Sequence, residues 1–132
     1  MKYLVDTDIC IYVINDRPKR VLERFIAEVP GDVAISSVTV GELAFGVAKT
    51  KSQRNREALQ AFLLPMEIVP FDAGAAMVYG EVRAELEGNG HPISPLDTMI
   101  AAHARALGLI LVTNNGREFS RVPRLTVENW AL

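Results

Sequence analysis

Short runs of Val, Ile and Leu recur along the chain, separated by longer segments in which apolar residues return every three or four positions. Runs of this length and composition are typical of buried strands in a parallel sheet. The strands predicted in this way are Tyr3–Val5, Val33–Ile35, Ile68–Phe71, Leu109–Val112 and Leu125–Val127.

Helical patterns fill the gaps between these strands. Ser52, Asp72 and Ser94 each precede an apolar stripe with helical spacing, and residues of these types cap helix N-termini. A further helix is predicted to follow Pro18, and Gly88-Asn-Gly90 is predicted to end the long helix that begins after Asp72. The alternation of strands and helices predicts an α/β domain with a mainly parallel sheet.

Length and composition predict one globular domain spanning residues 1–132. Hydrophobic residues make up 49% of the chain and charged residues 23%, which is typical of a folded protein with a substantial core. No apolar run approaches the ~20 residues that span a bilayer, and Asp6 interrupts the N-terminus too early for a signal peptide. The single cysteine, Cys10, has no partner for an internal disulfide, so a cytoplasmic location is expected.

The net charge of −2 gives no overall attraction to nucleic acid. The basic residues are nevertheless grouped, and two interpretations stay open: solvated helix faces, or a rim that contacts phosphates. The candidates for RNA contacts are Arg17, Lys19, Arg20, Lys49, Lys51 and Arg54.

Four acidic residues stand where strands end or helices begin. Asp6 and Asp8 close the first strand, Glu42 follows the apolar run from Val33, and Asp97 opens a helix. Ligands of open parallel sheets bind at the carboxyl ends of the strands, so these acids are expected to cluster. Two such charges ~4 Å apart repel by ~4 kcal/mol at an effective dielectric of ~20. A cation between them relieves this repulsion, and oxygen ligands favour Mg²⁺ or Mn²⁺.

Three of these acids also have structural interpretations. Asp8 is a candidate N-cap for a helix starting at Ile9, Glu42 a candidate exposed acid, and Asp97 a candidate partner of the helix dipole. Asp6 is the hardest to explain without a partner or a metal, because it ends an apolar strand.

Two other reactive side chains are predicted to be structural. Cys10 lies between two isoleucines and is interpreted as a small buried hydrophobe. His103 shares a helical face with apolar residues, which favours a core histidine over a metal ligand.

With these segments in order, the chain resembles the PIN-domain ribonucleases, and among them the VapC-type toxins of bacterial toxin–antitoxin pairs. The segments that match are Leu4–Asp8, Ser36–Leu43, Gly90–Ala104, Leu111–Phe119 and Val127–Trp130. The resemblance covers essentially the whole chain. It implies a three-layer α/β/α domain around a mainly parallel sheet of about five strands.

The resemblance implies a metal-dependent endoribonuclease. It assigns catalysis and the binding of Mg²⁺ or Mn²⁺ to Asp6, Glu42 and Asp97, with Asp8 as a peripheral ligand. The expected reaction is hydrolysis of a phosphodiester by metal-activated water, leaving 5′-phosphate and 3′-hydroxyl ends. Thr7 and Thr113 are expected to hydrogen-bond the carboxylates or bound waters, next to the ligands themselves.

The fourth motif departs from the family pattern. Many relatives have an aspartate two residues after the threonine, where this chain has Asn115. An asparagine accepts hydrogen bonds but brings no charge. Glu118 is a candidate for the missing carboxylate, and a surface acid is its other interpretation. Whether one or two metals bind is therefore open.

Partners also follow from the resemblance. The expected substrate is tRNA, specifically the anticodon region of initiator tRNA, and cutting it inhibits translation. A VapB-type antitoxin is expected to neutralise the enzyme, and the chain is expected to form a homodimer and a larger assembly with that antitoxin. Part of the apolar stretch from Ile9 to Val29 is a candidate groove for an antitoxin segment, with burial in the core as the alternative.

Two competing functions stay open at this point. Asp6-Thr-Asp8 after a strand is similar to the haloacid-dehalogenase phosphatases, in which the first aspartate is a nucleophile, although Thr113-Asn-Asn115 offers no later acidic pair. A binding module that has lost its chemistry at Asn115 is the non-enzymatic alternative.

Overall fold

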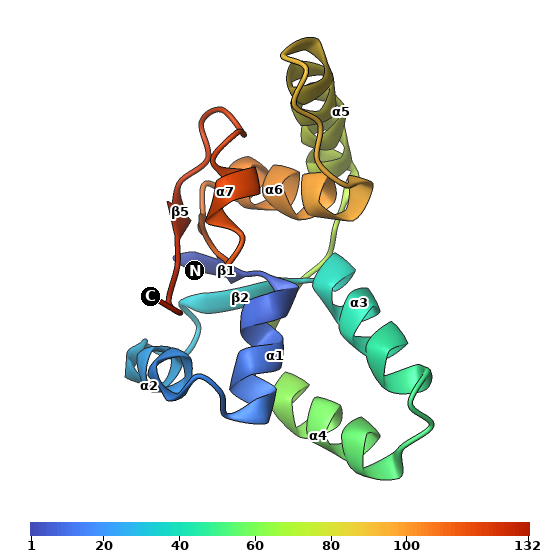
Figure 1. Cartoon of the computed structure of the whole chain (residues 1–132), viewed down its shortest axis with the longest axis vertical. Helices are drawn as coiled ribbons and strands as arrows, with labels where there is room; N and C mark the ends of the chain where they lie inside the picture. The colour runs from blue at the N-terminus through green and yellow to red at the C-terminus, as the bar shows by residue number, and fades with distance from the viewer.

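The computed structural model describes residues 1–132 and is built around a five-stranded, fully parallel sheet (Figure 1). The strand order is β3-β2-β1-β4-β5. The strands are β1 (Tyr3–Val5), β2 (Val33–Ser36), β3 (Glu67–Val69), β4 (Ile110–Val112) and β5 (Val127–Glu128). The predicted α/β class and five-stranded sheet are confirmed.

Seven helices connect the strands. They are α1 (Thr7–Asn15), α2 (Lys19–Ala27), α3 (Ser37–Ala48), α4 (Gln53–Leu63), α5 (Ala73–Gly88), α6 (Pro95–Leu107) and α7 (Gly116–Phe119). None of them is long and apolar enough to cross a membrane. In Figure 1, α1 to α4 lie on one side of the sheet, and α5, α6 and α7 lie on the other.

Alternation along the strands produces these two layers, because successive side chains of a strand point to opposite faces. Leu4, Ala34 and Leu111 belong to one core cluster, which they share with residues of α5, α6 and α7. Val5 and Val112 belong to the second cluster, together with residues of α1 to α4. The sheet is therefore buried on both faces, which explains why its central strands are continuous apolar runs.

The direction of the chain through the sheet reverses at β1. From β1 the chain moves through β2 to β3 on one side, whereas β4 and β5 are added on the other side. In open α/β sheets such a reversal opens a crevice at the carboxyl ends of the two strands concerned. The residues that follow β1 and β4, Asp6 and Thr113, therefore face each other across the place where a ligand is expected.

The outer strands deviate most from the sequence prediction. β1 has its predicted bounds. β3 (Glu67–Val69) begins one residue earlier and ends two residues earlier than the predicted strand Ile68–Phe71. Ile68 is 42% exposed, so the prediction of a buried strand is wrong here. β3 is an edge strand with a neighbour on one side only, and β5 likewise covers only Val127–Glu128.

Three of the predicted helix caps are present. The side chains of Ser52, Asp72 and Ser94 accept hydrogen bonds from the backbone N–H of Asn55, Ala75 and Asp97, respectively. These bonds satisfy N–H groups that have no partner within the helix.

The first helix starts earlier than its cap prediction implied. Helix α1 begins at Thr7 and is capped by Asp6, whose Oδ1 accepts a hydrogen bond from the Thr7 N–H at 2.8 Å. Asp8 is therefore a residue of the first turn, and its interpretation as the N-cap is wrong. Since Asp6 makes the cap, the carboxylate at the end of β1 also fixes where the following helix begins.

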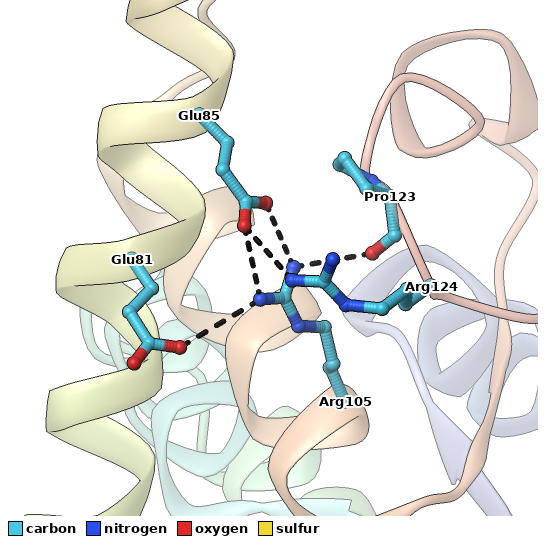
Figure 2. Close-up of polar contacts among 5 residues, drawn as sticks. All are labelled: Glu81, Glu85, Arg105, Pro123 and Arg124. Carbon is cyan, nitrogen blue, oxygen red and sulfur yellow. Dashed lines mark hydrogen bonds and ion pairs between the residues drawn. The ribbon is translucent and has the colours of Figure 1, made fainter.

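An ion-pair network joins α5, α6 and the segment before β5, as Figure 2 shows. The Arg105 side chain is 10% exposed and pairs with both oxygens of Glu85, at 2.9 and 3.2 Å. Arg105 also donates to the carbonyl of Pro123 at 3.1 Å, and Arg124 donates to Glu85 at 2.9 Å. These donors, Arg105 first, lower the pKa of Glu85. The network ties the long α5 to the body of the protein.

We predict that Arg105→Met lowers the free energy of unfolding by roughly 1–3 kcal/mol, because it leaves the partly buried Glu85 carboxylate without its main hydrogen-bond partner. Arg83→Met is the matched control, since Arg83 and Glu87 form an exposed pair on α5 and such pairs contribute little. Thermal unfolding of both variants checks the prediction. Equal melting temperatures would contradict a structural role for the network.

Candidate active site

Asp6 is the most buried acid of the candidate site. Its side chain accepts two hydrogen bonds, from the Thr7 N–H on Oδ1 and from Thr113 Oγ1 on Oδ2 at 2.7 Å. Burial, followed by the charge of Asp8, raises the pKa of Asp6 to about 7 despite these hydrogen bonds. A carboxylate that is costly to ionise gains most from a cation beside it.

Asp97 reaches the same region from the opposite layer. It lies in the first turn of α6, where the Asp97 N–H donates to the Ser94 hydroxyl at 3.2 Å. Burial is the first cause of its raised pKa, and the charges of Glu118 and then Glu42 raise it further. Asp97 also raises the pKa of Asp6. The fold therefore brings Asp97 into electrostatic contact with acids from three other segments.

Glu42 is connected to the end of β1 through a threonine. It lies on α3, and its Oε1 accepts a hydrogen bond from Thr7 Oγ1 at 2.7 Å. Thr7 is thus bonded to Asp6 through its N–H and to Glu42 through its hydroxyl. This double contact fixes the separation of two carboxylates that have no direct bond to each other.

Asp8 occupies the outer side of the site. Its Oδ2 accepts from the backbone N–H of Asn114 at 3.0 Å, and burial raises its pKa, with Asp97 adding to the rise. The side chain of Asn114 makes two further hydrogen bonds. Its Nδ2 donates to the Tyr12 hydroxyl, and its Oδ1 accepts from the side-chain amide of Asn129. Sequence reasoning missed Tyr12 and Asn129. The available signals were the i, i+4 spacing of Asp8 and Tyr12 on one helix and the position of Asn129 directly after β5.

The fourth motif forms a chain of hydrogen bonds leading to Asp6. The Asn115 N–H donates to Thr113 Oγ1 at 3.0 Å, and Thr113 donates in turn to Asp6. The Asn115 side-chain amide donates to Glu118 Oε2 at 3.0 Å. Glu118 is partly buried, and its charge raises the pKa of Asp97, so Glu118 remains a candidate for the fourth acid.

These residues fit a hard divalent cation through their chemistry. All side-chain donors are oxygens, several are carboxylates, and burial makes the charge of Asp6 unfavourable in isolation. No three His, Cys, Asp or Glu side chains form a preassembled ligand set. Mg²⁺ does not require one, because it keeps several waters and binds proteins through one or two carboxylates. Asp6 and Asp97, whose charges interact, are the two candidates in the middle of the cluster.

A groove of about 710 Å³ lies between α1, α3 and α4, and Glu42 is one of its lining residues. Its apolar lining includes Ile11, Ile14, Leu43, Val47 and Leu59. Part of the stretch Ile9 to Val29 is predicted to serve a groove for an antitoxin segment. In this groove that part comes from α1, whereas α2 does not contribute and α3 and α4 supply the rest of the lining.

The basic residues predicted to contact RNA lie in two regions, one around the groove and the adjoining α3–α4 turn and one beyond the far end of α1. Lys49 and Arg54 line the groove, with Lys49 about 10 Å along α3 from Glu42. Lys51 lies in the exposed turn between α3 and α4. The remaining three, Arg17, Lys19 and Arg20, are exposed beyond the far end of α1.

Cys10 and His103 are both structural, as the sequence predicts. Cys10 is fully buried, and burial raises its thiol pKa well above the usual value. His103 is 1% exposed and contacts the Ser36 hydroxyl through Nδ1 at 2.8 Å. Its ring packs edge-on against Phe71, and burial lowers its pKa.

A family model described as the PIN domain matches residues 3–125. The chain belongs to the PIN domain family. This membership decides between the two interpretations of Asp6-Thr-Asp8 and removes the phosphatase alternative. A curated relative from Shigella flexneri, described as tRNA(fMet)-specific endonuclease VapC, is 45% identical over 132 residues, which cover 99% of both chains.

Solved structures of PIN domains agree with the fold. The crystal structure of VapBC2 from Rickettsia felis, bound to a DNA fragment from their promoter, matches with a TM-score of 0.92 and 42% identity. That match covers 98% of this chain and 99% of the other. DNA-bound VapBC from Salmonella typhimurium matches with a TM-score of 0.90 and 40% identity over 98% of each chain.

The raised pKa of Asp6 predicts how the metal-free protein responds to pH. Because its folded pKa of about 7 exceeds the ordinary value of about 3.9, the folded state binds more protons between these values. Stability from this group is therefore complete below about pH 4 and declines as pH rises to about 7.

We predict that Asp6→Asn reduces this loss of stability between pH 5 and pH 8, measured by thermal unfolding in EDTA. Asp16→Asn is the matched control, because Asp16 is exposed at the end of α1 with a positive φ that asparagine tolerates. An unchanged pH dependence in Asp6→Asn would show that the Asp6 carboxyl is not the group in question.

Proposed function

We propose that this PIN domain is an endoribonuclease that hydrolyses RNA phosphodiester bonds with the help of a divalent cation, Mg²⁺ or Mn²⁺. The observation that carries the proposal is the meeting of Asp6, Glu42 and Asp97 at the point where the sheet order reverses. The described activity of the Shigella flexneri relative, 45% identical along the chain, supports the same chemistry.

The cation is assigned to Asp6 and Asp97, with Glu42 and Glu118 nearby and Asp8 at the periphery. When bound, it supplies Lewis acidity and an activated water for attack on phosphorus. Direct ligation by two carboxylates suffices for a hydrated Mg²⁺. The proposed site holds one or two divalent ions.

The chain's own residues supply the orientation that this chemistry needs. Thr113 and the Thr7 N–H hold one oxygen each of Asp6. The Thr7 hydroxyl holds Glu42, and the backbone at Asn114 holds Asp8. Fixed partners of this kind orient metal ligands and tune their basicity. Thr7, Thr113 and Asn115 are therefore assigned supporting roles next to the acids.

The proposed substrate is tRNA, and within it the anticodon region of initiator tRNA. The support comes from the Shigella flexneri and Salmonella typhimurium relatives, both described as tRNA(fMet)-specific endonucleases. An acidic site repels RNA unless a cation is present, so binding is expected to depend on the metal. Lys49 and Arg54, which line the groove beside Glu42, are the best placed of the basic candidates. The activity belongs in the cytoplasm, where tRNA is used.

The proposed partner is a VapB-type antitoxin. Solved relatives are VapBC toxin–antitoxin complexes, and the groove between α1, α3 and α4 offers an apolar floor for a peptide next to Glu42. A segment bound there would lie against the candidate active site and block it. We further propose that the chain forms a homodimer and joins a larger assembly with the antitoxin.

The first test is digestion of total tRNA by the purified, antitoxin-free protein with Mg²⁺, with Mn²⁺ or with EDTA. We expect a discrete cut that requires the cation and is reduced at least about a hundredfold in Asp6→Asn. Asp16→Asn is the matched acidic control, at the opposite end of α1, and is expected to cut normally.

Either of two results would reject the nuclease proposal. One is the absence of any cleavage by a protein shown to be folded, which would favour the binding-module alternative. The other is undiminished cleavage by Asp6→Asn, which would displace the active site from this cluster.

Glu118 is proposed as the fourth acid in place of the residue missing at Asn115. We predict that Glu118→Gln lowers kcat/KM for the tRNA cut by roughly 10- to 100-fold, because it removes a negative charge facing Asp97. Asn115→Ala is expected to lower it less. Glu57→Gln, an exposed acid on α4, provides the control, and normal cleavage by Glu118→Gln would return Glu118 to the class of surface acids.

A further inference from the structure

Asn115 occupies a cap position but does not cap. It precedes α7 as the N-cap residue, yet its side chain accepts no hydrogen bond from the helix backbone. The cap residues Ser36, Ser52, Asp72 and Ser94 all make that bond. Asparagine is among the most favourable capping residues, so the side chain of Asn115 has a different role here.

The side chain of Asn115 is directed at Glu118. Its Nδ2 donates to Glu118 Oε2 at 3.0 Å, one turn along α7. The Asn115 N–H meanwhile donates to Thr113 Oγ1, whose hydroxyl donates to Asp6 Oδ2. One residue thereby connects the carboxylate of Glu118 with the carboxylate of Asp6 through defined hydrogen bonds.

The chemistry of this contact requires a neutral donor. An aspartate at position 115 would place a second carboxylate about where the amide nitrogen now meets Glu118, and two such charges repel strongly. An amide instead offers two N–H donors and no charge. Asn115 can therefore hold the Glu118 carboxylate in one orientation through this hydrogen bond, and the charge of Glu118 in turn raises the pKa of Asp97.

We propose that Asn115 is a positioning residue for Glu118 and not a degraded metal ligand. The amide fixes the rotamer of Glu118, and Glu118 brings the negative charge to the cation site. This inference rests on the proposed function, because it assigns Glu118 to that site. It also explains how a chain without an acid at position 115 retains a fourth carboxylate at the cluster.

Titration of the metal-free protein with MnCl₂ by calorimetry tests the role of Asn115 without RNA. We expect Asn115→Ala to weaken Mn²⁺ binding about tenfold, while the melting temperature in EDTA stays near that of the unmodified protein. Asn89→Ala is the matched control, since Asn89 is an exposed asparagine at the C-terminal end of α5. Unaltered Mn²⁺ affinity in Asn115→Ala would overturn the proposal.

A double-mutant cycle separates positioning from direct ligation. If Asn115 acts only through Glu118, adding Asn115→Ala to Glu118→Gln weakens Mn²⁺ binding no further. Independent, additive losses would mean that Asn115 binds the cation itself. Asn115→Asp gives a second check, with weaker Mn²⁺ binding expected from repulsion of Glu118, whereas tighter binding would identify position 115 as a ligand site and overturn the proposal.

The outcomes also distinguish this inference from the proposed function. Metal-dependent cleavage of tRNA combined with unaltered Mn²⁺ affinity in Asn115→Ala rejects only the positioning role. If the unmodified, folded protein does not cleave tRNA at all, the proposed nuclease function itself is rejected.

Discussion

Burial of the Asp6 carboxylate at the end of β1 is the constraint around which this site is organised. The carboxylate is 5% exposed, and burial makes its ionised form costly. Two hydrogen bonds from Thr7 and Thr113 reduce that cost but leave the pKa near 7. In the proposed function, a cation bound beside Asp6 removes the remaining cost. The same carboxylate caps α1, so the position of the helix and the chemistry of the site depend on one side chain.

The other acids are arranged around this centre by elements from both layers of the fold. α1 and α3 bring Asp8 and Glu42 from one side of the sheet, and α6 and α7 bring Asp97 and Glu118 from the other. The carboxylates of Glu42, Asp8 and Glu118 are each held by a hydrogen bond from a neighbouring residue. In the proposed function, the repulsion among these charges favours the binding of a cation between them.

The acids at the centre of the candidate site could be predicted from the sequence because their signals are local. Asp6 ends an apolar run, and Ser94-Pro95 predicts the helix that carries Asp97; both features are visible within a few residues. The edge strands were predicted less well, because Ile68 and its neighbours read as a buried run until the sheet order shows that β3 has one neighbour. The cap of α1 was misplaced by two residues since Asp6 and Asp8 carry the same local signal.

Long-range contacts were beyond the reach of sequence reasoning. The pairing of Arg105 with Glu85 joins residues 20 positions apart, and the groove combines α1 with α3 and α4 instead of α2. The spacing of Asp8 and Tyr12 and the position of Asn129 after β5 are visible in the sequence, but only the fold shows that both residues contact Asn114. The orientation of Glu118 likewise follows only from the structure, in which the side-chain amide of Asn115 donates a hydrogen bond to its carboxylate.

The most direct test of the central claim is a crystal structure of the protein soaked in MnCl₂, with the ion located by its anomalous scattering. We predict a Mn²⁺ peak within about 2.0–2.3 Å of an Asp6 oxygen, with Asp97 on its opposite side. A Mn²⁺ peak elsewhere, or none at a concentration that supports cleavage, would contradict the claim that these carboxylates form the metal site.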